Sequence, residues 1–407
     1  MSGAPKHLSA PRHFPGPSPV SLSIGILAFP MAHPVWGGIP WSVYRLTDAL
    51  AAHFPEDMFH LVFYDEPSND VSKRNLGRLL RTHRNITRTV LPKGDPAVRW
   101  CEKNADVVWG TVSGVLHTER VPQVVTLYDM RMFTRYRESY KNYLMHRAGL
   151  AYALKHARVA VAISKSTRAE VLKYYPGQGL ERKLDLVYLG VPAGFDDPAG
   201  VKPLWPDYVE GEPFITTTYD PLPQKRMDLV KRVAPALDEH GWRLVCMGGH
   251  RGPKADRMYK HPRVHYPGFV GDDEFPSIVK ASSLFLFMSE YEGFGYPPYE
   301  AMALGVPVLY NSRCDALRRE VGGMAHSFAT DDGLGEALDM LLSSESRRTE
   351  HVAEGLNLIK RFSWERAARQ YMYLFRLAHD VPEIDLRPGG TPTSLDQVAK
   401  GDAPSRP

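Results

Sequence analysis

The chain has 407 residues with a formal net charge of +4, and 43% of its residues are hydrophobic and 24% charged. A chain of this length is too long to fold around a single hydrophobic core of ordinary size, and it suits two domains of about 190 residues each. The three cysteines are scattered and no apolar run reaches about 18 residues, which argues against a disulfide scaffold, a secreted protein with a signal peptide and a membrane-spanning protein. We therefore expect a cytoplasmic globular protein.

Positive charge is concentrated in the first half of the chain. Residues 1–195 contain 25 Lys and Arg against 15 Asp and Glu. Within this half, residues 131–147 alternate basic side chains with Tyr136, Tyr140 and Tyr143. Such a surface suits an anionic membrane, an anionic acceptor or nucleic acid, but it is also typical of a solvated helix. No nucleic-acid-binding motif accompanies it, so we expect no nucleic acid partner.

The first half alternates between strand and helix patterns. Residues 1–20 are rich in proline and small residues and are expected to be disordered. A glycine pair, Gly37 and Gly38, lies between the first apolar strand and a helix, where it permits close backbone approach to a ligand. Strands are expected at 23–29, 58–65, 105–110, 122–129 and up to Ser164, with helices over 36–54 and 138–157. The pattern predicts an α/β domain over 21–195 with a parallel sheet.

The second half repeats this alternation. Residues 196–211, rich in glycine and proline, are expected to form a linker to a second domain over 212–362. Its strands are expected at 213–218, 242–249, 263–270, 283–289, 306–310 and 325–330. A final helix over 363–380 has Ser363 as a candidate cap, and the tail over 381–407 is expected to be disordered.

Two glutamates stand out in the second domain, in the stretch SEYEGFGYPPYEAMALGVPV. Glu292 lies in a loop with Gly293 and Gly295, and Glu300 lies just inside a helix that the preceding pair Pro297-Pro298 can start. The loop presents backbone N–H groups at the positive end of a helix and can hold a diphosphate. The carboxylates would then face hydroxyl groups, which together indicate a nucleotide sugar. Alternatively, Glu300 only complements its helix dipole and Glu292 is a solvated loop residue.

This stretch resembles the glutamate-pair motif of the retaining glycosyltransferases of family 4, which have the GT-B fold. The resemblance covers roughly residues 22 to 380 and implies two facing Rossmann-like domains with parallel sheets and a cleft between them. It implies that the last helix crosses back to the first domain. The N-terminal domain would bind the acceptor and the C-terminal domain the donor.

The resemblance also implies roles for individual residues. Glu300 would accept from the ribose and Glu292 from the sugar ring, with Glu292 counted among the catalytic residues. Backbone groups of Gly293, Phe294 and Gly295 would hold the diphosphate, and Gly37 and Gly38 would face the donor across the cleft. Val270 would lie beside the nucleobase.

Two positions depart from the family pattern. Tyr128-Asp129 stands where the family usually has His-Asp, and a tyrosine there can still donate a hydrogen bond near the reacting carbon, although it does not titrate near neutrality. Asp129 would orient the loop or the acceptor, or serve as a structural cap. Lys225 matches the lysine that neutralises the donor diphosphate. The companion arginine has no counterpart, and Arg226 is expected to compensate.

These features predict a glycosyltransferase that moves a hexose from a nucleotide-diphosphate sugar, GDP-mannose first and UDP-glucose second, to a saccharide or polyprenyl-linked acceptor. No Asp-x-Asp triplet is present, so we expect no metal and no cofactor. The protein would lie in the cytoplasm, with possible peripheral contact with the inner face of an anionic membrane. A GT-B nucleotide-sugar epimerase, a phosphorylase and a non-catalytic nucleotide-sugar-binding scaffold are the alternatives.

Overall fold

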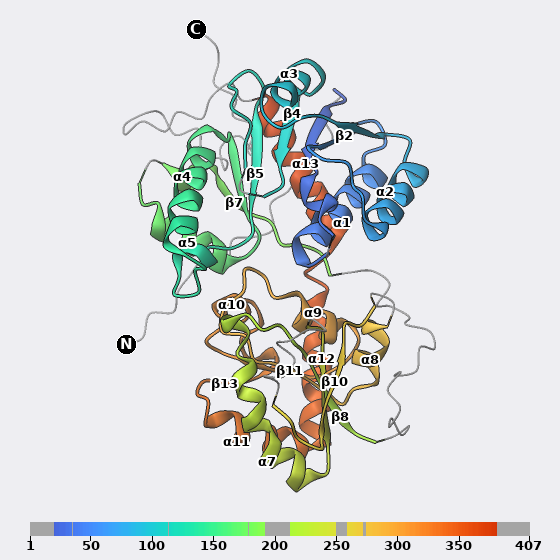
Figure 1. Cartoon of the computed structure of the whole chain (residues 1–407), viewed down its shortest axis with the longest axis vertical. Helices are drawn as coiled ribbons and strands as arrows, with labels where there is room; N and C mark the ends of the chain where they lie inside the picture. The colour runs from blue at the N-terminus through green and yellow to red at the C-terminus, as the bar shows by residue number, and fades with distance from the viewer. Residues whose placement is uncertain are drawn as a thin grey trace.

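The computed structural model describes residues 20–34, 36–112, 114–177, 179–191, 212–249, 259–271 and 274–380. Its strands form two parallel sheets, one in each of two lobes (Figure 1). The linker expected at 196–211 and the disordered ends expected at 1–20 and 381–407 lie outside the described residues, except for Val20. Within the described residues, no helix combines the length and the apolar character that crossing a membrane requires.

The sheet of the N-terminal lobe has seven parallel strands that build outward from its middle. Its order is β3-β2-β1-β4-β5-β6-β7, so the direction of winding reverses between β1 and β4. A reversal of this kind opens a crevice at the carboxyl ends of the two strands. The strands are β1 (Ser23–Leu27), β2 (Met58–Phe63), β3 (Ile86–Val90), β4 (Val107–Gly110), β5 (Gln123–Leu127), β6 (Val159–Ala162) and β7 (Leu184–Leu186).

The sheet of the C-terminal lobe is built in the same way from six parallel strands. Its order is β10-β9-β8-β11-β12-β13, and winding reverses between β8 and β11. The loops after these two strands therefore border a second crevice. The strands are β8 (Phe214–Thr218), β9 (Arg243–Met247), β10 (Val264–Gly268), β11 (Leu284–Phe287), β12 (Val308–Asn311) and β13 (His326–Phe328).

Helices connect the strands and cover the sheets. The N-terminal lobe contains α1 (Gly38–His53), α2 (Asp70–Thr82), α3 (Asp95–Asn104), α4 (Tyr140–His156), α5 (Lys165–Tyr174) and α6 (Leu180–Lys183). The C-terminal lobe contains α7 (Val230–His240), α8 (Phe275–Ala281), α9 (Tyr296–Ala303), α10 (Asp315–Val321), α11 (Gly333–Leu342) and α12 (Glu345–Ile359). This is the α/β architecture of two facing Rossmann-like lobes that the sequence predicted.

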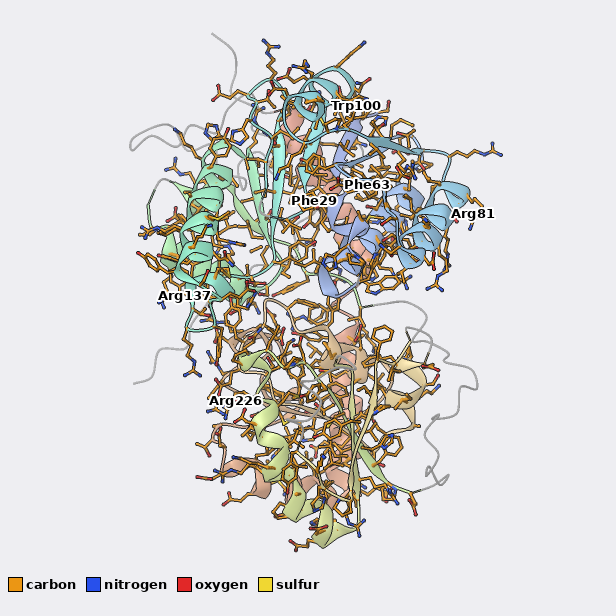
Figure 2. All side chains as sticks on the ribbon, in the orientation of Figure 1. Phe29, Phe63, Arg81, Trp100, Arg137 and Arg226 are labelled. Atoms are coloured by element: carbon orange, nitrogen blue, oxygen red, sulfur yellow. The ribbon has the colours of Figure 1, made fainter. Side chains whose placement is uncertain are left out.

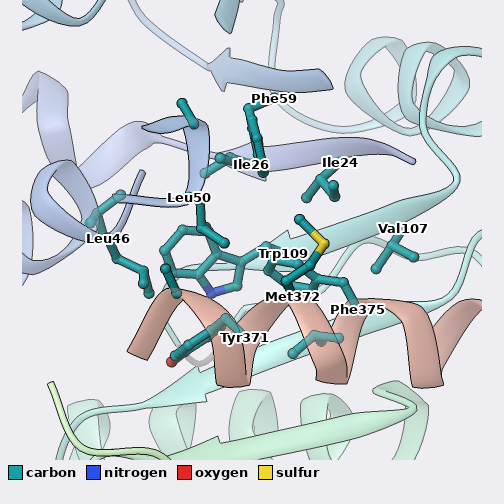
Figure 3. Close-up of a cluster of buried hydrophobic side chains, with 14 of the residues drawn as sticks. Ile24, Ile26, Leu46, Leu50, Phe59, Val107, Trp109, Tyr371, Met372 and Phe375 are labelled. Carbon is teal, nitrogen blue, oxygen red and sulfur yellow. The ribbon is translucent and has the colours of Figure 1, made fainter. Parts of the chain in front are cut away.

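The last helix, α13 (Trp364–Asp380), joins the core of the N-terminal lobe, although the chain enters it from the C-terminal lobe (Figure 1). Tyr371 and Phe375 lie fully buried beside Trp109 of β4, with ring centroids 5.4 and 6.2 Å from its own (Figure 3). The Trp109 indole N–H donates to the Thr126 hydroxyl, which lies 2.8 Å from the Tyr371 hydroxyl. The crossing helix is therefore an integral part of the first lobe's core, as the family resemblance implied.

The structure adds elements that the sequence did not predict. No helix or strand was predicted over residues 71–88, but they form most of α2 and the start of β3. Only Ile86 of β3 is buried, and the strand is placed by its pairing with β2, where Phe59 is opposite Ile86. The helices α3 and α12 were also not predicted. Edge strands and exposed helices have weak apolar patterns, so contacts with the rest of the fold determine whether such segments form a strand or a helix.

Candidate active site

A cleft of about 920 Å³ lies between the two lobes. It is lined by residues after β1, β5, β8 and β11, so the crevices of both sheets open into it. Eleven of the twelve site residues that the sequence predicted line this cleft: Gly37, Gly38, Tyr128, Asp129, Lys225, Val270, Glu292, Gly293, Phe294, Gly295 and Glu300. The topology thus brings together residues that are far apart in sequence, such as Gly37 and Glu292, which are 255 positions apart.

The glycine loop of the C-terminal lobe runs from β11 into α9. Gly295 precedes the first residue of the helix with φ 84°, a left-handed conformation that favours glycine. Proline in the first turn of α9 removes an N–H that would have no intrahelical partner. Gly293 lies against the N-terminal lobe so closely that a Cβ would approach the Tyr128 carbonyl oxygen to 2.0 Å. The loop is therefore shaped for close contact across the cleft.

Lys225 and Glu292 form the charged centre of the cleft. The Lys225 ammonium donates to a Glu292 carboxylate oxygen at 2.7 Å, and both side chains are largely buried. Burial acts to lower the pKa of Lys225, but the Glu292 carboxylate outweighs it, so the pKa is raised above its ordinary value. Lys225 is thus a fixed positive charge beside the glycine loop. Glu300 lines the same cleft from α9.

Tyr128, one of the two departures from the resembled pattern, is held inside the cleft wall. Tyr128 is 7% exposed, and its hydroxyl lies 2.8 Å from the hydroxyl of Ser42 on α1. Burial raises the pKa of Tyr128 well above its ordinary value, and the Ser42 hydrogen bond only partly opposes this shift. The phenol therefore stays neutral and acts as a hydrogen-bonding group, with no acid or base role near neutral pH.

Asp129 sits at the same wall and has its own backbone partner. Burial raises the pKa of Asp129, and the Arg131 backbone N–H, which it accepts at 2.8 Å, acts in the opposite direction. The next residue, Met130, donates its N–H at 2.8 Å to the hydroxyl of Tyr291 in the C-terminal lobe. The Tyr128 to Met130 segment therefore contacts both the cleft and the opposite lobe.

Arg226 occupies a different place from the one expected. It does not line the cleft, and its guanidinium binds Asp228 at 2.9 Å, Asp331 at 2.6 Å and the buried carboxylate of Glu290. The backbone of Arg226 has φ 52°, the one left-handed conformation of a non-glycine residue among the described ranges. The side chain lies at one side of the C-terminal lobe (Figure 2). Arg226 thus serves an internal ion-pair cluster, and Lys225 carries the positive charge of the site.

The structure brings further residues to the cleft that sequence reasoning missed. Aromatic and basic side chains of the N-terminal lobe form one wall: Trp36, Trp41, Tyr44, Arg45, Arg74 and Arg78. Trp36, Trp41 and Arg45 flank the Gly37-Gly38 pair in sequence, which is the one signal that could have found them. Arg74 and Arg78 lie on α2, a helix that the sequence did not predict.

One group of described residues has the spacing to hold a metal ion, and it lies outside the cleft. It consists of Glu239, His240 and Asp339, on α7 and α11. These residues do not line the cleft. The cleft offers instead Lys225 and the N-terminal end of α9 as positive groups for an anion.

Comparisons with known proteins agree with this geometry. Residues 214–344 match the family described as glycosyl transferases group 1. The O-antigen chain mannosyltransferase B of Escherichia coli is 27% identical over 271 residues, which cover 62% of this chain and 70% of that protein. The GDP-mannose:cellobiosyl-diphosphopolyprenol alpha-mannosyltransferase of Komagataeibacter xylinus is 25% identical over 181 residues, 41% of this chain and 46% of that protein.

The fold has solved counterparts. The Anabaena protein HepE, crystallised with UDP and glucose, superposes on this structure with a TM-score of 0.67 at 15% sequence identity. The superposition covers 87% of this chain and 99% of the HepE chain. Its likeness extends over both lobes. This likeness shows that the chain has the two-lobed GT-B fold. Within this fold, the match to the glycosyl transferases group 1 family covers residues 214–344, in the C-terminal lobe.

Proposed function

We propose that this protein is a retaining glycosyltransferase of family 4 that transfers a hexose from a nucleotide-diphosphate sugar to a saccharide or polyprenyl-linked acceptor. The observation that carries the proposal is the meeting of Lys225, Glu292 and Glu300 with the glycine loop in one interlobe cleft. The Lys225 ammonium and the backbone N–H groups of the glycine loop can bind a diphosphate. The Glu292 and Glu300 carboxylates can accept hydrogen bonds from the hydroxyl groups of the sugars on either side of that diphosphate.

The ion pair between Lys225 and Glu292 gives donor binding a defined first step. A diphosphate at the glycine loop would compete with Glu292 for the Lys225 ammonium, because the two now lie 2.7 Å apart. As Lys225 turns to phosphate, the Glu292 carboxylate becomes available to accept from the sugar hydroxyls. Glu300, eight residues after Glu292 and within α9, accepts from the ribose hydroxyl groups.

The transfer itself follows from this arrangement. The departing diphosphate takes the proton from the acceptor hydroxyl on the same face, while the sugar passes through an oxocarbenium-like state with retention of configuration. Backbone N–H groups near Gly38, Gly293 and Gly295, together with Lys225, stabilise the charge that develops on the leaving group. Tyr128, a neutral phenol, can only hydrogen-bond here. No metal takes part in this scheme.

The donor is proposed as GDP-mannose, with UDP-glucose second. Two relatives are named mannosyltransferases, and one of these names includes GDP-mannose. The structural neighbour with UDP and glucose supports the second choice. The K. xylinus enzyme's name includes a diphosphopolyprenol, which supports a lipid-linked acceptor.

A lipid-linked acceptor would require contact with a membrane at the cytoplasmic face. Helix α4 exposes Tyr140, Leu144 and Met145, with exposed fractions of 64, 46 and 63%. Lys141 and Arg147 are exposed on the same helix. Apolar side chains among basic ones suit the surface of an anionic bilayer. Binding to vesicles with and without phosphatidylserine, for the protein and for its Leu144→Asp variant, tests this part of the proposal.

Activity assays on matched variants test the main proposal. Thermal stabilisation by GDP, UDP, ADP and their sugars first identifies the donor, since a bound ligand raises stability by RT ln(1 + [L]/Kd). Lys225→Ala and Glu300→Ala should then abolish transfer, while Lys280→Ala, an exposed cation on α8, should not change it. Full activity in both cleft variants would refute the assignment. Turnover of the nucleotide sugar without an acceptor would identify an epimerase.

A further inference from the structure

Three arginines share one wall of the cleft. Arg45 belongs to α1, and Arg74 and Arg78 belong to α2. The four-residue spacing of Arg74 and Arg78 puts them on the same face of their helix. Trp36 and Trp41 line the cleft beside them. This wall lies in the N-terminal lobe, opposite the glycine loop.

No described carboxylate lies within salt-bridge distance of any of these three guanidinium groups, whereas many other arginines of the described ranges are paired. Arg226 and Arg313, for example, each bind Asp331. The acid nearest in sequence on α1, Asp48, is held by His83 at 2.7 Å. Three positive charges on one wall repel each other, and an anion bound between them removes this repulsion.

The wall also holds donors without partners. The Nε of Arg45 and the Nδ2 of Asn75 are buried and have no hydrogen-bond partner among the described residues. Asn75 is 7% exposed and lines the cleft between Arg74 and Arg78 in sequence. Buried N–H groups are normally satisfied, so unpaired donors beside three cations indicate a missing acceptor. The Arg45 guanidinium lies over the Trp41 ring, 5.4 Å from its centroid.

The position of this wall separates it from the proposed donor site. Lys225 and the α9 N-terminus serve the donor diphosphate from the C-terminal lobe, whereas the arginines project from the lobe to which we assign the acceptor. Guanidinium groups bind phosphate oxygens in parallel pairs of hydrogen bonds. Trp36 and Trp41, whose rings meet edge to face at 5.0 Å, can pack against a sugar ring next to such a group.

We propose that Arg45, Arg74, Arg78 and Asn75 form an arginine subsite that binds a phosphate or diphosphate group of the acceptor. This inference rests on the proposed glycosyltransferase function and narrows its acceptor to phosphorylated saccharides. The subsite would anchor the phosphate while the acceptor hydroxyl reaches the sugar carbon near Glu292. It would discriminate against neutral saccharides, because they leave the arginines without a counter-charge.

Binding measurements on the whole protein test the subsite directly. GDP and UDP, each at saturation, first fill the donor site. Calorimetric titration with fructose 6-phosphate and glucose 1-phosphate, and with fructose and glucose as neutral controls, then reports the second site. We expect the sugar phosphates to bind at least tenfold more tightly than the neutral sugars. The double variant R74Q/R78Q should lose this difference.

A matched variant and a separate readout keep the test decisive. Arg81→Gln removes an exposed arginine of α2 that does not line the cleft and points outward (Figure 2), so it should bind sugar phosphates as the native chain does. Nucleotide affinity should be unchanged in R74Q/R78Q. If that variant instead loses nucleotide affinity, the arginines serve the donor and the subsite is refuted. Equal binding of phosphorylated and neutral sugars by the native chain would also overturn the proposed subsite. If the native chain bound no nucleotide at all, the proposed function itself would be refuted.

Discussion

At the residue scale, the position of Gly293 sets how closely the lobes approach. A Cβ there would lie 2.0 Å from the Tyr128 carbonyl oxygen and 2.9 Å from the Asp129 Cβ, both in the opposite lobe. Gly293→Ala must therefore push the lobes apart or displace the loop. We expect it to lower the free energy of unfolding by about 1–3 kcal/mol and to weaken nucleotide binding. Urea unfolding and nucleotide titration measure the two effects.

Gly149 provides the control for this substitution. It lies within α4, it is exposed, and an added Cβ would meet no atom within 4 Å. Gly149→Ala should stabilise the protein by about 0.5–1 kcal/mol, because glycine is a poor helix former. An equal effect of the two substitutions would contradict the close approach at Gly293.

A second residue-scale prediction concerns acid stability. Hydrogen bonds from Arg226, and then from Arg313, lower the pKa of Asp331 from 3.8 to about 2. A depressed native pKa means that the stabilisation is complete above the unfolded value of 3.8 and is lost as the pH falls toward 2. In the Asp331→Asn variant, the free energy of unfolding should therefore fall less steeply between pH 3.8 and about pH 2 than in the native chain.

Urea unfolding at a series of pH values checks the acid prediction. Asp65→Asn is the control, because Asp65 is exposed and has no ion pair among the described residues. The Asp65 variant should keep the native pH profile between 4 and 2. An unchanged profile for Asp331→Asn would show that its ion pairs with the arginines do not persist in solution.

At the element scale, the crossing helix α13 carries part of the first lobe's core. Phe375 is fully buried against Trp109 (Figure 3), so Phe375→Ala leaves a cavity. We expect a loss of about 3–5 kcal/mol in unfolding free energy. Phe269→Ala removes the same atoms from a side chain that is 69% exposed, and it should change stability by less than about 0.5 kcal/mol. Similar losses in both variants would mean that α13 does not dock as described.

Elements with local signals were predictable from the sequence. The turn at Gly293 and Gly295 and the start of α9 are encoded by neighbouring glycine and proline residues, so the loop and Glu300 could be placed in advance. The buried strands β6 and β11 are apolar along their whole length. These patterns need no knowledge of distant parts of the chain.

Features that depend on distant partners could not be predicted. Arg226 was assigned to the donor because it follows Lys225, but its partners Glu290 and Asp331 are more than 60 residues away. Strand β3 is defined by its pairing with β2, and the arginine wall by the meeting of α1 with α2. The sequence of two adjacent cations does not reveal which one lines the cleft and which one joins an ion-pair cluster away from it.

At the scale of the whole molecule, hydrogen bonds across the interface hold the two lobes in one arrangement. The Tyr291 hydroxyl accepts from the Met130 N–H at 2.8 Å and donates to Glu170 at 2.7 Å, so one residue of the C-terminal lobe satisfies two groups of the other. The Ser164 hydroxyl donates to the Gly293 carbonyl, and Lys165 binds Glu320. These contacts favour the closed cleft.

Tyr291→Phe should shift the molecule toward an open form. It leaves the Met130 N–H and the Glu170 carboxylate without this partner, at a cost of about 1–3 kcal/mol to the closed arrangement. Small-angle X-ray scattering should show a larger radius of gyration, and saturating nucleotide should reverse part of the change. Tyr259→Phe, at a side chain that is 37% exposed, should leave the scattering unchanged. An identical scattering curve for Tyr291→Phe would argue that other contacts hold the lobes.

The path of α13 has a consequence for synthesis on the ribosome. Residues 364–380 complete the core around Trp109, yet they are translated after both sheets. The first lobe must wait, with an unfilled apolar groove, until more than 170 further residues have emerged beyond Leu186. A nascent chain in this state exposes apolar surface that chaperones bind, and the N-terminal lobe can complete its core only after the whole C-terminal lobe and α13 have been translated.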